Sequence, residues 1–354
     1  MEMRNVFIVG RGLSGRVCLG TKCRSRPTFG LGQVSRAFST TQTTWASGFA
    51  ESQSKKAPAH KVEADTEKFR THSVQDLLSL KGRVTVVTGG ARGIGLALAR
   101  GTAELGSDVA VLDILEKPSD AFLDFQKDLG VRAKYYRTSV TNPATLSQTF
   151  EQVIADFGRI DNCVTAAGIA VDKPFLETTA EEGMKVLDVN VCNPSGIVIV
   201  VGNWEGLTQH PQVMGTYLSA QLAAKQMQAQ NSGGSIVMVA SVAARAALPS
   251  QHLSIYGASK GAVKGLCRQL SVELSPSNIR VNTISPGYIS TEMTNRLAAT
   301  NPTLLSVFNS AAPLQRIGDR ADLKTVVAYL CSDAAAYTTG TDILVTGGLH
   351  AGRL

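Results

Sequence analysis

The feature that most constrains the fold is a glycine-rich segment that joins a short apolar run to a helical pattern. The run Val84–Thr88 leads into Thr88-Gly89-Gly90-Ala91-Arg92-Gly93-Ile94-Gly95, and the sequence predicts a helix over Ile94–Leu105. Glycines permit a tight turn and bring backbone N–H groups close to a pyrophosphate at a helix N-terminus. This context predicts a dinucleotide-binding loop. Its expected cofactor-binding residues are Gly89, Arg92, Gly93, Ile94 and Gly95.

Short apolar runs alternate with helix-length amphipathic segments through the rest of the chain. The runs are Val84–Thr88, Val109–Leu112, Ile160–Thr165, Ser235–Ala240, Val281–Ile284 and Ile343–Val345. Such alternation predicts βαβ units, and therefore a parallel sheet covered by helices on both faces. We expect one doubly wound, Rossmann-type α/β domain over residues 81–350, preceded by a linker over residues 41–80.

Positive charge is concentrated ahead of the predicted domain. The formal net charge is +7, and residues 1–50 account for +6 of it, because they hold seven Lys and Arg against the single acid Glu2. An acid-poor segment rich in Arg and Ser is typical of a mitochondrial presequence, and residues 35–41 resemble a matrix-processing site. We therefore expect residues 1–40 to direct import into the mitochondrial matrix. A segment without a targeting role would leave the protein in the cytoplasm.

The composition indicates neither a nucleic-acid partner nor a membrane span, and the expected partner is a small-molecule substrate. Residues 51–354 carry a net charge of only +1, so a nucleic-acid partner is not expected. No apolar run approaches the ~20 residues of a membrane-spanning helix. The six cysteines form no Cys-x-x-Cys pair and the five histidines are scattered, so neither a disulfide framework nor a metal site is predicted.

An acidic residue ends the second predicted strand. Asp113 lies 18 residues after Gly95, where a carboxylate can accept hydrogen bonds from the adenosine ribose. A carboxylate at this place repels a 2′-phosphate and favours NAD, whereas the guanidinium of Arg92 can bind that phosphate. We expect NAD, with NADP as the less favoured alternative.

A tyrosine and a lysine four residues apart provide the expected acid–base chemistry. Tyr256 and Lys260 lie one turn apart on a predicted helix. A free tyrosine has a pKa of about 10 and is a poor base at neutral pH. A nearby positive charge stabilises the phenolate and lowers that pKa, so Tyr256 can exchange a proton with a substrate oxygen. Ser241, 15 residues earlier, is expected to donate to the same oxygen.

The order of these motifs resembles the short-chain dehydrogenase/reductase family over roughly residues 81–349. The matching segments are Gly89–Gly95, Asn190 in Asp188-Val189-Asn190, Ser241, Tyr256-Gly257-Ala258-Ser259-Lys260 and Pro286-Gly287-Tyr288-Ile289-Ser290-Thr291. The resemblance implies an enzyme, often a homo-oligomer, that transfers hydride between a nicotinamide cofactor and an alcohol or ketone. It implies four catalytic residues, namely Asn190, Ser241, Tyr256 and Lys260.

The resemblance also implies roles in cofactor binding. Lys260 would hold the nicotinamide ribose, Asn190 would anchor a water that relays protons to Lys260, and Ile289 and Thr291 would hold the carboxamide. The cofactor-binding residues expected beyond the glycine loop are Asp113, Ala166, Gly168, Tyr256, Lys260, Pro286, Gly287, Ile289 and Thr291. The chain departs from the family where Thr165-Ala166-Ala167-Gly168 replaces Asn-Asn-Ala-Gly, and where Ser139-Val140 replaces Asp-Val.

A segment of 22 residues, 191–212, interrupts the predicted helix that carries Asn190. Pro194 and several glycines in it break helices, and its removal joins Asn190 to Val213 and restores the family pattern. We hypothesise that it is a translated, unspliced intron. Codons for Val191-Cys192 can form a splice donor, codons for Leu207-Thr208 a branch site, and the codon for Gln212 a splice acceptor. The alternative is a genuine surface loop. A chain that keeps the segment is expected to be weakly active.

The expected substrate is a secondary alcohol or ketone. The Ser–Tyr spacing, Arg280–Ile289 and Tyr337-Thr338-Thr339-Gly340 resemble fungal polyol and ketose reductases, which act on arabinitol, mannitol and sorbose. Three polar residues before the catalytic helix, Ser250, Gln251 and His252, are candidates to bind a polyhydroxy substrate. The alternatives are a mitochondrial 3-oxoacyl thioester reductase and a catalytically weak cofactor-binding protein.

Overall fold

The computed structural model describes residues 71–191, 215–292, 294 and 302–352. The expected presequence and all but one residue of the segment 191–212 lie outside this part. The strands are β1 (Val84–Thr88), β2 (Asp108–Asp113), β3 (Ala133–Arg137), β4 (Asn162–Thr165), β5 (Gly234–Val239), β6 (Ile279–Pro286) and β7 (Asp342–Val345). The α-helices are α3 (Val74–Leu78), α4 (Gly93–Ala103), α5 (Asp120–Asp128), α6 (Pro143–Phe157), α7 (Ala180–Asn190), α8 (Gly215–Gln230), α9 (Ser254–Glu273), α11 (Pro302–Ala311) and α12 (Lys324–Cys331).

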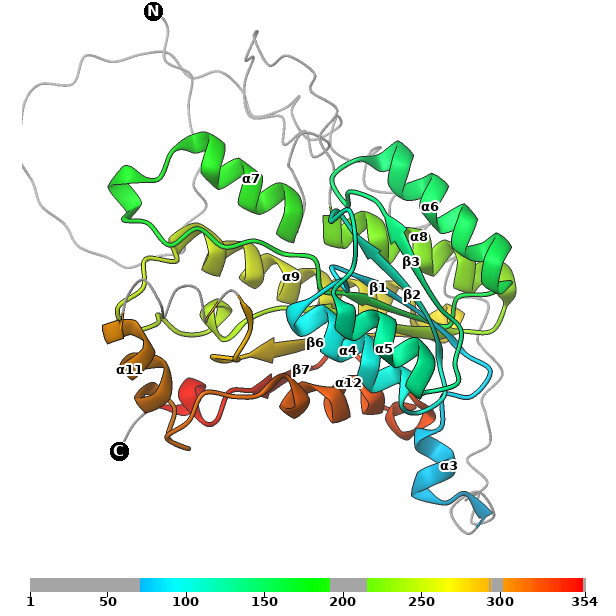
Figure 1. The fold of residues 1–354 in the computed structure, drawn as a ribbon. Helices are drawn as coiled ribbons and strands as arrows, with labels where there is room; N and C mark the ends of the chain where they lie inside the picture. The colour runs from blue at the N-terminus through cyan, green and yellow to red at the C-terminus, as the bar shows by residue number, and fades with distance from the viewer. Residues whose placement is uncertain (1–70, 192–214, 293, 295–301, 353–354) are drawn as a thin grey trace, which may run out of the picture. The chain divides into compact units, whose positions relative to one another are not determined.

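The strands form one parallel sheet in the order β3-β2-β1-β4-β5-β6-β7 (Figure 1). Successive strands run outward from β1 to β3, and the chain then returns to place β4 on the other side of β1. In such sheets, ligands bind at the carboxyl ends of the strands where the order reverses. The sheet confirms the predicted doubly wound α/β domain and places the expected cofactor crevice between β1 and β4.

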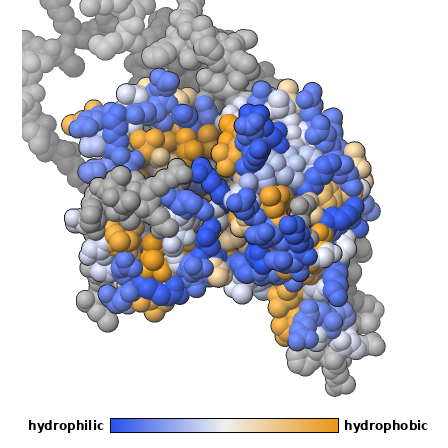
Figure 2. All heavy atoms as spheres, viewed as in Figure 1, coloured by the Kyte–Doolittle hydropathy of each residue, from blue (hydrophilic) through white to orange (hydrophobic). Residues whose placement is uncertain are grey.

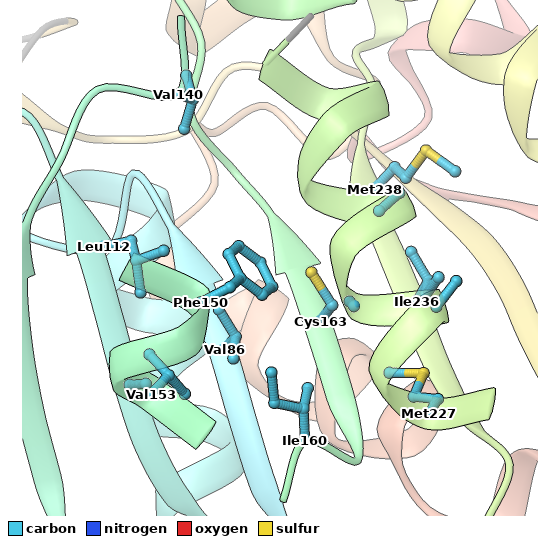
Figure 3. Close-up of a cluster of buried hydrophobic side chains, with 14 of the residues drawn as sticks. Val86, Leu112, Val140, Phe150, Val153, Ile160, Cys163, Met227, Ile236 and Met238 are labelled. Atoms are coloured by element: carbon cyan, nitrogen blue, oxygen red, sulfur yellow. The ribbon is translucent and has the colours of Figure 1, made fainter. Parts of the chain in front are cut away.

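Each face of the sheet carries its own hydrophobic core, because successive strand residues point to opposite faces. Val86 of β1 belongs to the core under α6, α8 and α9, while the next residue, Val87, belongs to the core under α4, α5 and α12. Figure 3 shows part of the first core, where Phe150 of α6 lies beside the strand residues Val86 and Cys163, and Met227 of α8 lies beside Ile236. All five residues of β1 are buried. The central strand is therefore fixed from both sides, and so is the loop that leaves it.

Two elements lie where the sequence pattern indicated none. The strand β3 is at the edge of the sheet and has exposed Lys134 and Arg137, so it shows no continuous apolar run. Helix α3 lies in the segment expected to be a linker, and Ser73 and Asp76 cap its N-terminus reciprocally. Leu80, which follows α3, is fully buried in the second core. The packed domain therefore begins before residue 81.

The surface gives no sign of a membrane-spanning element in the described residues. Figure 2 shows mainly hydrophilic residues on one face, with separate hydrophobic areas between them. Within the residues that the structure describes, no helix is both long enough and apolar enough to cross a membrane.

Candidate active site

The glycine loop leaves β1 and passes close to the end of β4. A Cβ atom added to Gly89 would lie 2.6 Å from Cα of Ala167, and Gly89 has a φ of +68°. A Cβ atom on Gly95 would overlap the carbonyl oxygen of Gly89. These two glycines are therefore required for the turn and for the close approach of α4 to it. Because the glycines place no side chains over the backbone N–H groups at the N-terminus of α4, the loop fits the pyrophosphate of a dinucleotide.

The remaining predicted residues of the loop surround this turn. Gly93 and Ile94 begin α4, and Gly93 has a φ of +59°. Arg92 is exposed. Ala166 donates its N–H to the carbonyl oxygen of Thr88 at 3.0 Å, which joins the end of β4 to the loop. The structure thus brings the expected glycine-loop residues and Ala166 together at the crevice.

Asp113 ends β2 beside the glycine loop. Its Oδ2 accepts a hydrogen bond from the N–H of Ala91 at 3.1 Å, and its Oδ1 accepts one from the N–H of Leu115 at 3.2 Å. The carboxylate is therefore held by backbone donors on two loops. Near it, Ser119 donates its N–H to the carbonyl oxygen of Ala91 at 3.1 Å, and the Ser119 hydroxyl is buried without a partner among the described residues.

The residues expected to move the proton lie on β5 and α9. Ser241 follows β5, and its hydroxyl accepts the N–H of Ala243 at 3.1 Å, which fixes the serine at the start of a 3-10 turn. The serine hydroxyl also hydrogen-bonds the Tyr256 side chain. Lys260 Nζ lies 5.8 Å from the centre of the Tyr256 ring and donates to the carbonyl oxygen of Val239 at 2.8 Å. The three side chains therefore converge, as the sequence predicted.

The proton affinities follow from burial. Removal from water raises the pKa of Tyr256, and the hydrogen bond from Ser241 acts in the opposite direction. Burial lowers the pKa of Lys260 to about 8, since little surrounds its ammonium group to replace water. The expected depression of the tyrosine pKa by Lys260 is thus not the dominant effect in this structure, because the ammonium group is hydrogen-bonded to Val239 rather than to the phenol.

Asn190 ends α7, and its side chain holds the loop after β4 to the catalytic helix. Its Oδ1 accepts the N–H of Ile169 at 2.8 Å, and its Nδ2 donates to the carbonyl oxygen of Ile169 at 2.9 Å and to Oγ of Ser259 at 3.0 Å. A Cβ atom on Gly168 would contact Asn190 Oδ1 at 3.3 Å and Lys260 Nζ at 3.4 Å. Gly168 therefore lies between Asn190 and Lys260, and a side chain there would press lightly on both. The anchoring of a relay water by Asn190 stays a prediction.

The segment after β6 returns towards the glycine loop. Pro286 ends the strand, and a Cβ atom on Gly287 would lie 2.9 Å from Cα of Thr346. Ile289 is buried in the second core, so its contribution to cofactor binding has to come from its backbone. Thr291 donates its N–H to Oγ1 of Thr294 at 2.8 Å, and Glu292 Oε2 lies 3.8 Å from a Cβ position on Gly93. The predicted carboxamide-binding segment therefore lies beside the loop that would hold the pyrophosphate.

Two polar residues near the site were missed from the sequence. Asp172 follows β4, and its Oδ1 accepts the N–H of His252 at 2.7 Å. Tyr288 follows β6, and its hydroxyl is buried without a partner among the described residues. Tyr288 stood inside a recognised motif, and its position immediately before Ile289 was the available signal. Asp172 belongs to no motif and is identified only by its contacts.

Two family models match the chain. The model described as short chain dehydrogenase matches residues 83–201, and the model described as Enoyl-(Acyl carrier protein) reductase matches residues 203–350. A sorbose reductase of Candida albicans is 34% identical, over 78% of this chain and 90% of the reductase. The chain therefore belongs to the short-chain dehydrogenase/reductase family. It is an oxidoreductase that acts on alcohols or ketones with a nicotinamide cofactor.

Within this family the chain is similar to enzymes of sugar alcohols and ketones. An NADP-dependent mannitol dehydrogenase of Aureobasidium melanogenum is 32% identical, over 78% of this chain and 95% of the relative. The NADPH-dependent 3-quinuclidinone reductase from Rhodotorula rubra has a solved structure that aligns with a TM-score of 0.67. That reductase is 33% identical, over 78% of this chain and 95% of its own. A homo-oligomeric state stays a prediction. Within the described residues, no group of three His, Cys, Asp or Glu side chains is arranged to hold a metal ion.

Proposed function

We propose that this enzyme interconverts a polyol and the corresponding ketose, with NADP(H) as the hydride carrier. The observation that carries the substrate proposal is a group of three polar side chains, Asp172, Gln251 and Tyr288, which we call the polar group. Its members lie on the loops that follow β4, β5 and β6, at the carboxyl edge of the sheet. The similarity to a sorbose reductase and a mannitol dehydrogenase supports the same substrate class.

The members of the polar group are linked through Asp172. Gln251 Nε2 lies 3.5 Å from Asp172 Oδ2, and the neighbouring N–H of His252 donates to Asp172 Oδ1. Burial, together with the negative charge of Asp172, raises the pKa of Tyr288 to about 12. The Tyr288 phenol therefore stays protonated at neutral pH and is a donor.

Two atoms of the polar group lack a partner within the part of the chain that the structure describes, and a ligand can supply one once it displaces the side chains that cover them. The Oε1 atom of Gln251 and the hydroxyl of Tyr288 are buried and have no partner among the described residues. A buried polar atom without a hydrogen bond costs about 1–3 kcal/mol. A substrate with several hydroxyl groups offers donors to Gln251 and acceptors to Tyr288, whereas a simple ketone offers neither beyond its carbonyl. A site of this kind discriminates strongly against substrates that lack the hydroxyls.

The catalytic trio supplies the proton chemistry of this proposal. The nicotinamide ring, when bound, supplies or accepts the hydride at the substrate carbon. Tyr256 gives a proton to the ketose oxygen or takes it from the polyol hydroxyl. Ser241 orients that oxygen by hydrogen bonding, and Lys260 places a positive charge next to the phenol. Because burial raises the pKa of Tyr256, the phenol is protonated at neutral pH and can act as the acid when the ketose is reduced.

The substrate proposal is tested by comparing ketoses with a ketone that lacks hydroxyls. We expect kcat/KM for fructose or sorbose to exceed that for cyclohexanone, and Tyr288→Phe and Gln251→Leu to lower the ketose value by about tenfold each while sparing cyclohexanone. Tyr337→Phe is the matched control, because Tyr337 is fully exposed. Faster turnover of cyclohexanone by the wild type, or equal losses on both substrates, would disprove the proposal.

The choice of NADP(H) replaces the preference for NAD that Asp113 indicated. Both oxygens of Asp113 have backbone partners, so its charge is partly compensated. Exposed Arg92 and the unpartnered hydroxyl of Ser119 flank Ala91 and can bind a 2′-phosphate. The printed cofactor of the Aureobasidium and Rhodotorula enzymes is NADP or NADPH.

The ratio of kcat/KM for NADPH to that for NADH tests the cofactor proposal. We expect a ratio above one in the wild type, and a fall of at least about tenfold in Arg92→Ala, since one charge-assisted contact contributes about 1.5–3 kcal/mol. Arg268→Ala, which removes an exposed arginine of α9, is the control. A higher kcat/KM for NADH than for NADPH in the wild type would contradict the proposal and identify NAD as the cofactor.

A 3-oxoacyl thioester reductase is the second candidate. It is favoured by the family model described as Enoyl-(Acyl carrier protein) reductase, which matches residues 203–350. Turnover of an acetoacetyl thioester by the wild type, together with no turnover of ketoses, would favour this candidate over the polyol proposal.

We further propose that residues 1–40 direct the enzyme to the mitochondrial matrix. The support is their composition, which is rich in Arg and Ser and holds one acid. A fluorescent fusion to the full chain should enter mitochondria, and the same fusion without residues 1–40 should remain in the cytoplasm. Equal distributions of the two fusions would contradict the proposal.

A further inference from the structure

The end of α7 and the start of α8 are hydrogen-bonded to each other, although many residues separate them in the chain. Thr216 Oγ1 donates to the carbonyl oxygen of Asn190 at 2.8 Å, and the N–H of Tyr217 donates to the carbonyl oxygen of Val191 at 3.4 Å. A Cβ atom on Gly215 would also overlap the carbonyl oxygen of Val189. The two helices thus meet end to end.

These contacts have the register of one continuous helix. In an α-helix each N–H donates to the carbonyl four residues earlier, and a threonine hydroxyl commonly bonds that same carbonyl. The bond from Thr216 to Asn190 and the bond from Tyr217 to Val191 each span 26 residues, which is 22 more than a helix requires. One turn further on, Ser219 Oγ donates at 2.7 Å to the carbonyl oxygen of Gly215, four residues before it. The bonds across the junction are therefore those of a helix interior.

The number of surplus residues agrees with the length derived from the sequence pattern. The hydrogen bonds include Val191 in the helix, so they define the inserted segment as residues 192–213. The sequence pattern defined it as residues 191–212. Residues 191 and 213 are both valine, so either removal gives the same polypeptide, Asn-Val-Met-Gly-Thr-Tyr. In addition, one family model stops at residue 201 and the other starts at residue 203, within this segment.

We infer that α7 and α8 are two halves of one helix into which 22 residues have been inserted, and that the fully active enzyme is the form without them. The two hydrogen bonds keep the register of the uninterrupted helix, although Val191 itself departs from helical geometry, with a φ of -135° and a ψ of -81°. The sheet and the site residues therefore assemble with the insertion present, but the junction beside the site is distorted. The insertion leaves the helix next to Asn190, which positions Ile169 and Ser259. In a chain that keeps the insertion, the peptide bond that would join the two halves of the helix is absent. Only non-covalent contacts then hold the two helix ends together.

Deletions of different lengths test the inference, because one residue of error rotates α8 by about 100° about its axis. Removal of 192–213 should raise the melting temperature of the full chain and raise kcat/KM at least about tenfold, as expected for a better positioned site. Removal of 192–212 or of 192–214 should lower the melting temperature below that of the full chain. These two variants are the matched controls, since they differ from the first by a single residue.

The melting temperature and cofactor binding keep the inference independent of the substrate assignment. A deletion of 192–213 that melts no higher than the full chain, or three deletions with equal melting temperatures, would overturn it. If the 192–213 deletion is more stable and binds NADPH but turns over no ketose, the proposed function fails while the inference stands. Sequencing of the transcript gives a second test: 66 nucleotides present in every mature message would exclude a retained intron.

Discussion

The side-chain amide of Asn190 donates to Oγ of Ser259 at 3.0 Å, and Ser259 in turn donates to the carbonyl oxygen of Tyr256 at 2.7 Å. The end of α7 is thereby tied to the catalytic helix α9 between its tyrosine and its lysine. Because Asn190 is fully buried and bonds Ile169 as well, its side chain joins the loop after β4 directly to α9.

We predict that Asn190→Ala lowers both stability and turnover. The substitution leaves two part-buried backbone groups of Ile169 without partners and removes the buried bond to Ser259. We expect the free energy of unfolding to fall by about 2–4 kcal/mol, since each unsatisfied group costs about 1–3 kcal/mol. Urea denaturation measures the loss. Asn309→Ala, on the exposed side of α11, is the control and should change the stability little. Equal effects of the two substitutions would show that the Asn190 contacts do not position the helix.

Ser241→Ala should shift the pH dependence of alcohol oxidation. The hydrogen bond from Ser241 opposes the increase that burial causes in the pKa of Tyr256, so its removal raises that pKa further. Oxidation needs the phenolate, and the rising limb of kcat/KM against pH should therefore move to higher pH. Ser254→Ala, at the exposed N-terminus of α9, should leave the profile in place. A lower rate with an unmoved profile would limit Ser241 to binding the substrate.

Lys260 makes stability depend on pH in an unusual direction. Burial lowers its pKa from 10.5 to about 8 in the folded state, so between pH 8 and pH 10.5 the unfolded state binds more protons. Stability contributed by this group therefore rises with pH across that window and is lost as the pH falls through 8. Relative to Lys260→Met, the wild type should gain about 2 kcal/mol of unfolding free energy between pH 7 and pH 9.5. An unchanged difference between the two proteins over this range would contradict the lowered pKa.

Sequence patterns could predict the buried strands and the closeness of Tyr256 to Lys260 because each depends on local spacing. The run Val84–Thr88 is apolar because β1 is buried on both faces, and Tyr256 and Lys260 are spaced by one helical turn. Edge strand β3 was not predicted from its own pattern, since Lys134 and Arg137 face water. Asp172 was not predicted because its role arises from contact with His252, 80 residues away, and no local pattern encodes such a contact.

The length of the proposed insertion follows from the sequence pattern, but its exact ends do not. The pattern of helix residues placed the break near Asn190, whereas the choice between Val191 and Val213 has no consequence for the polypeptide that would remain. Only the hydrogen bond from Tyr217 to Val191 identifies which valine completes the helix. The choice of cofactor is limited in the same way. The sequence shows that residue 113 is acidic, but it does not show that backbone N–H groups bind both oxygens of its carboxylate.

Gly95→Ala and Gly261→Ala should have opposite effects although both glycines lie in helices. A Cβ atom on Gly95 would overlap the carbonyl oxygen of Gly89, so the substitution pushes α4 away from the glycine loop, and the backbone atoms involved cannot move aside cheaply. We expect a lower melting temperature and at least about tenfold weaker NADPH binding, as expected when a closely packed phosphate loop is displaced.

Around Gly261, in α9, nothing lies within 4 Å of the added atom. Alanine there should leave NADPH binding unchanged and stabilise the helix by about 1 kcal/mol. Thermal denaturation and fluorescence titration with NADPH measure both effects. Unchanged NADPH binding in Gly95→Ala would show that the loop between β1 and α4 does not hold the cofactor.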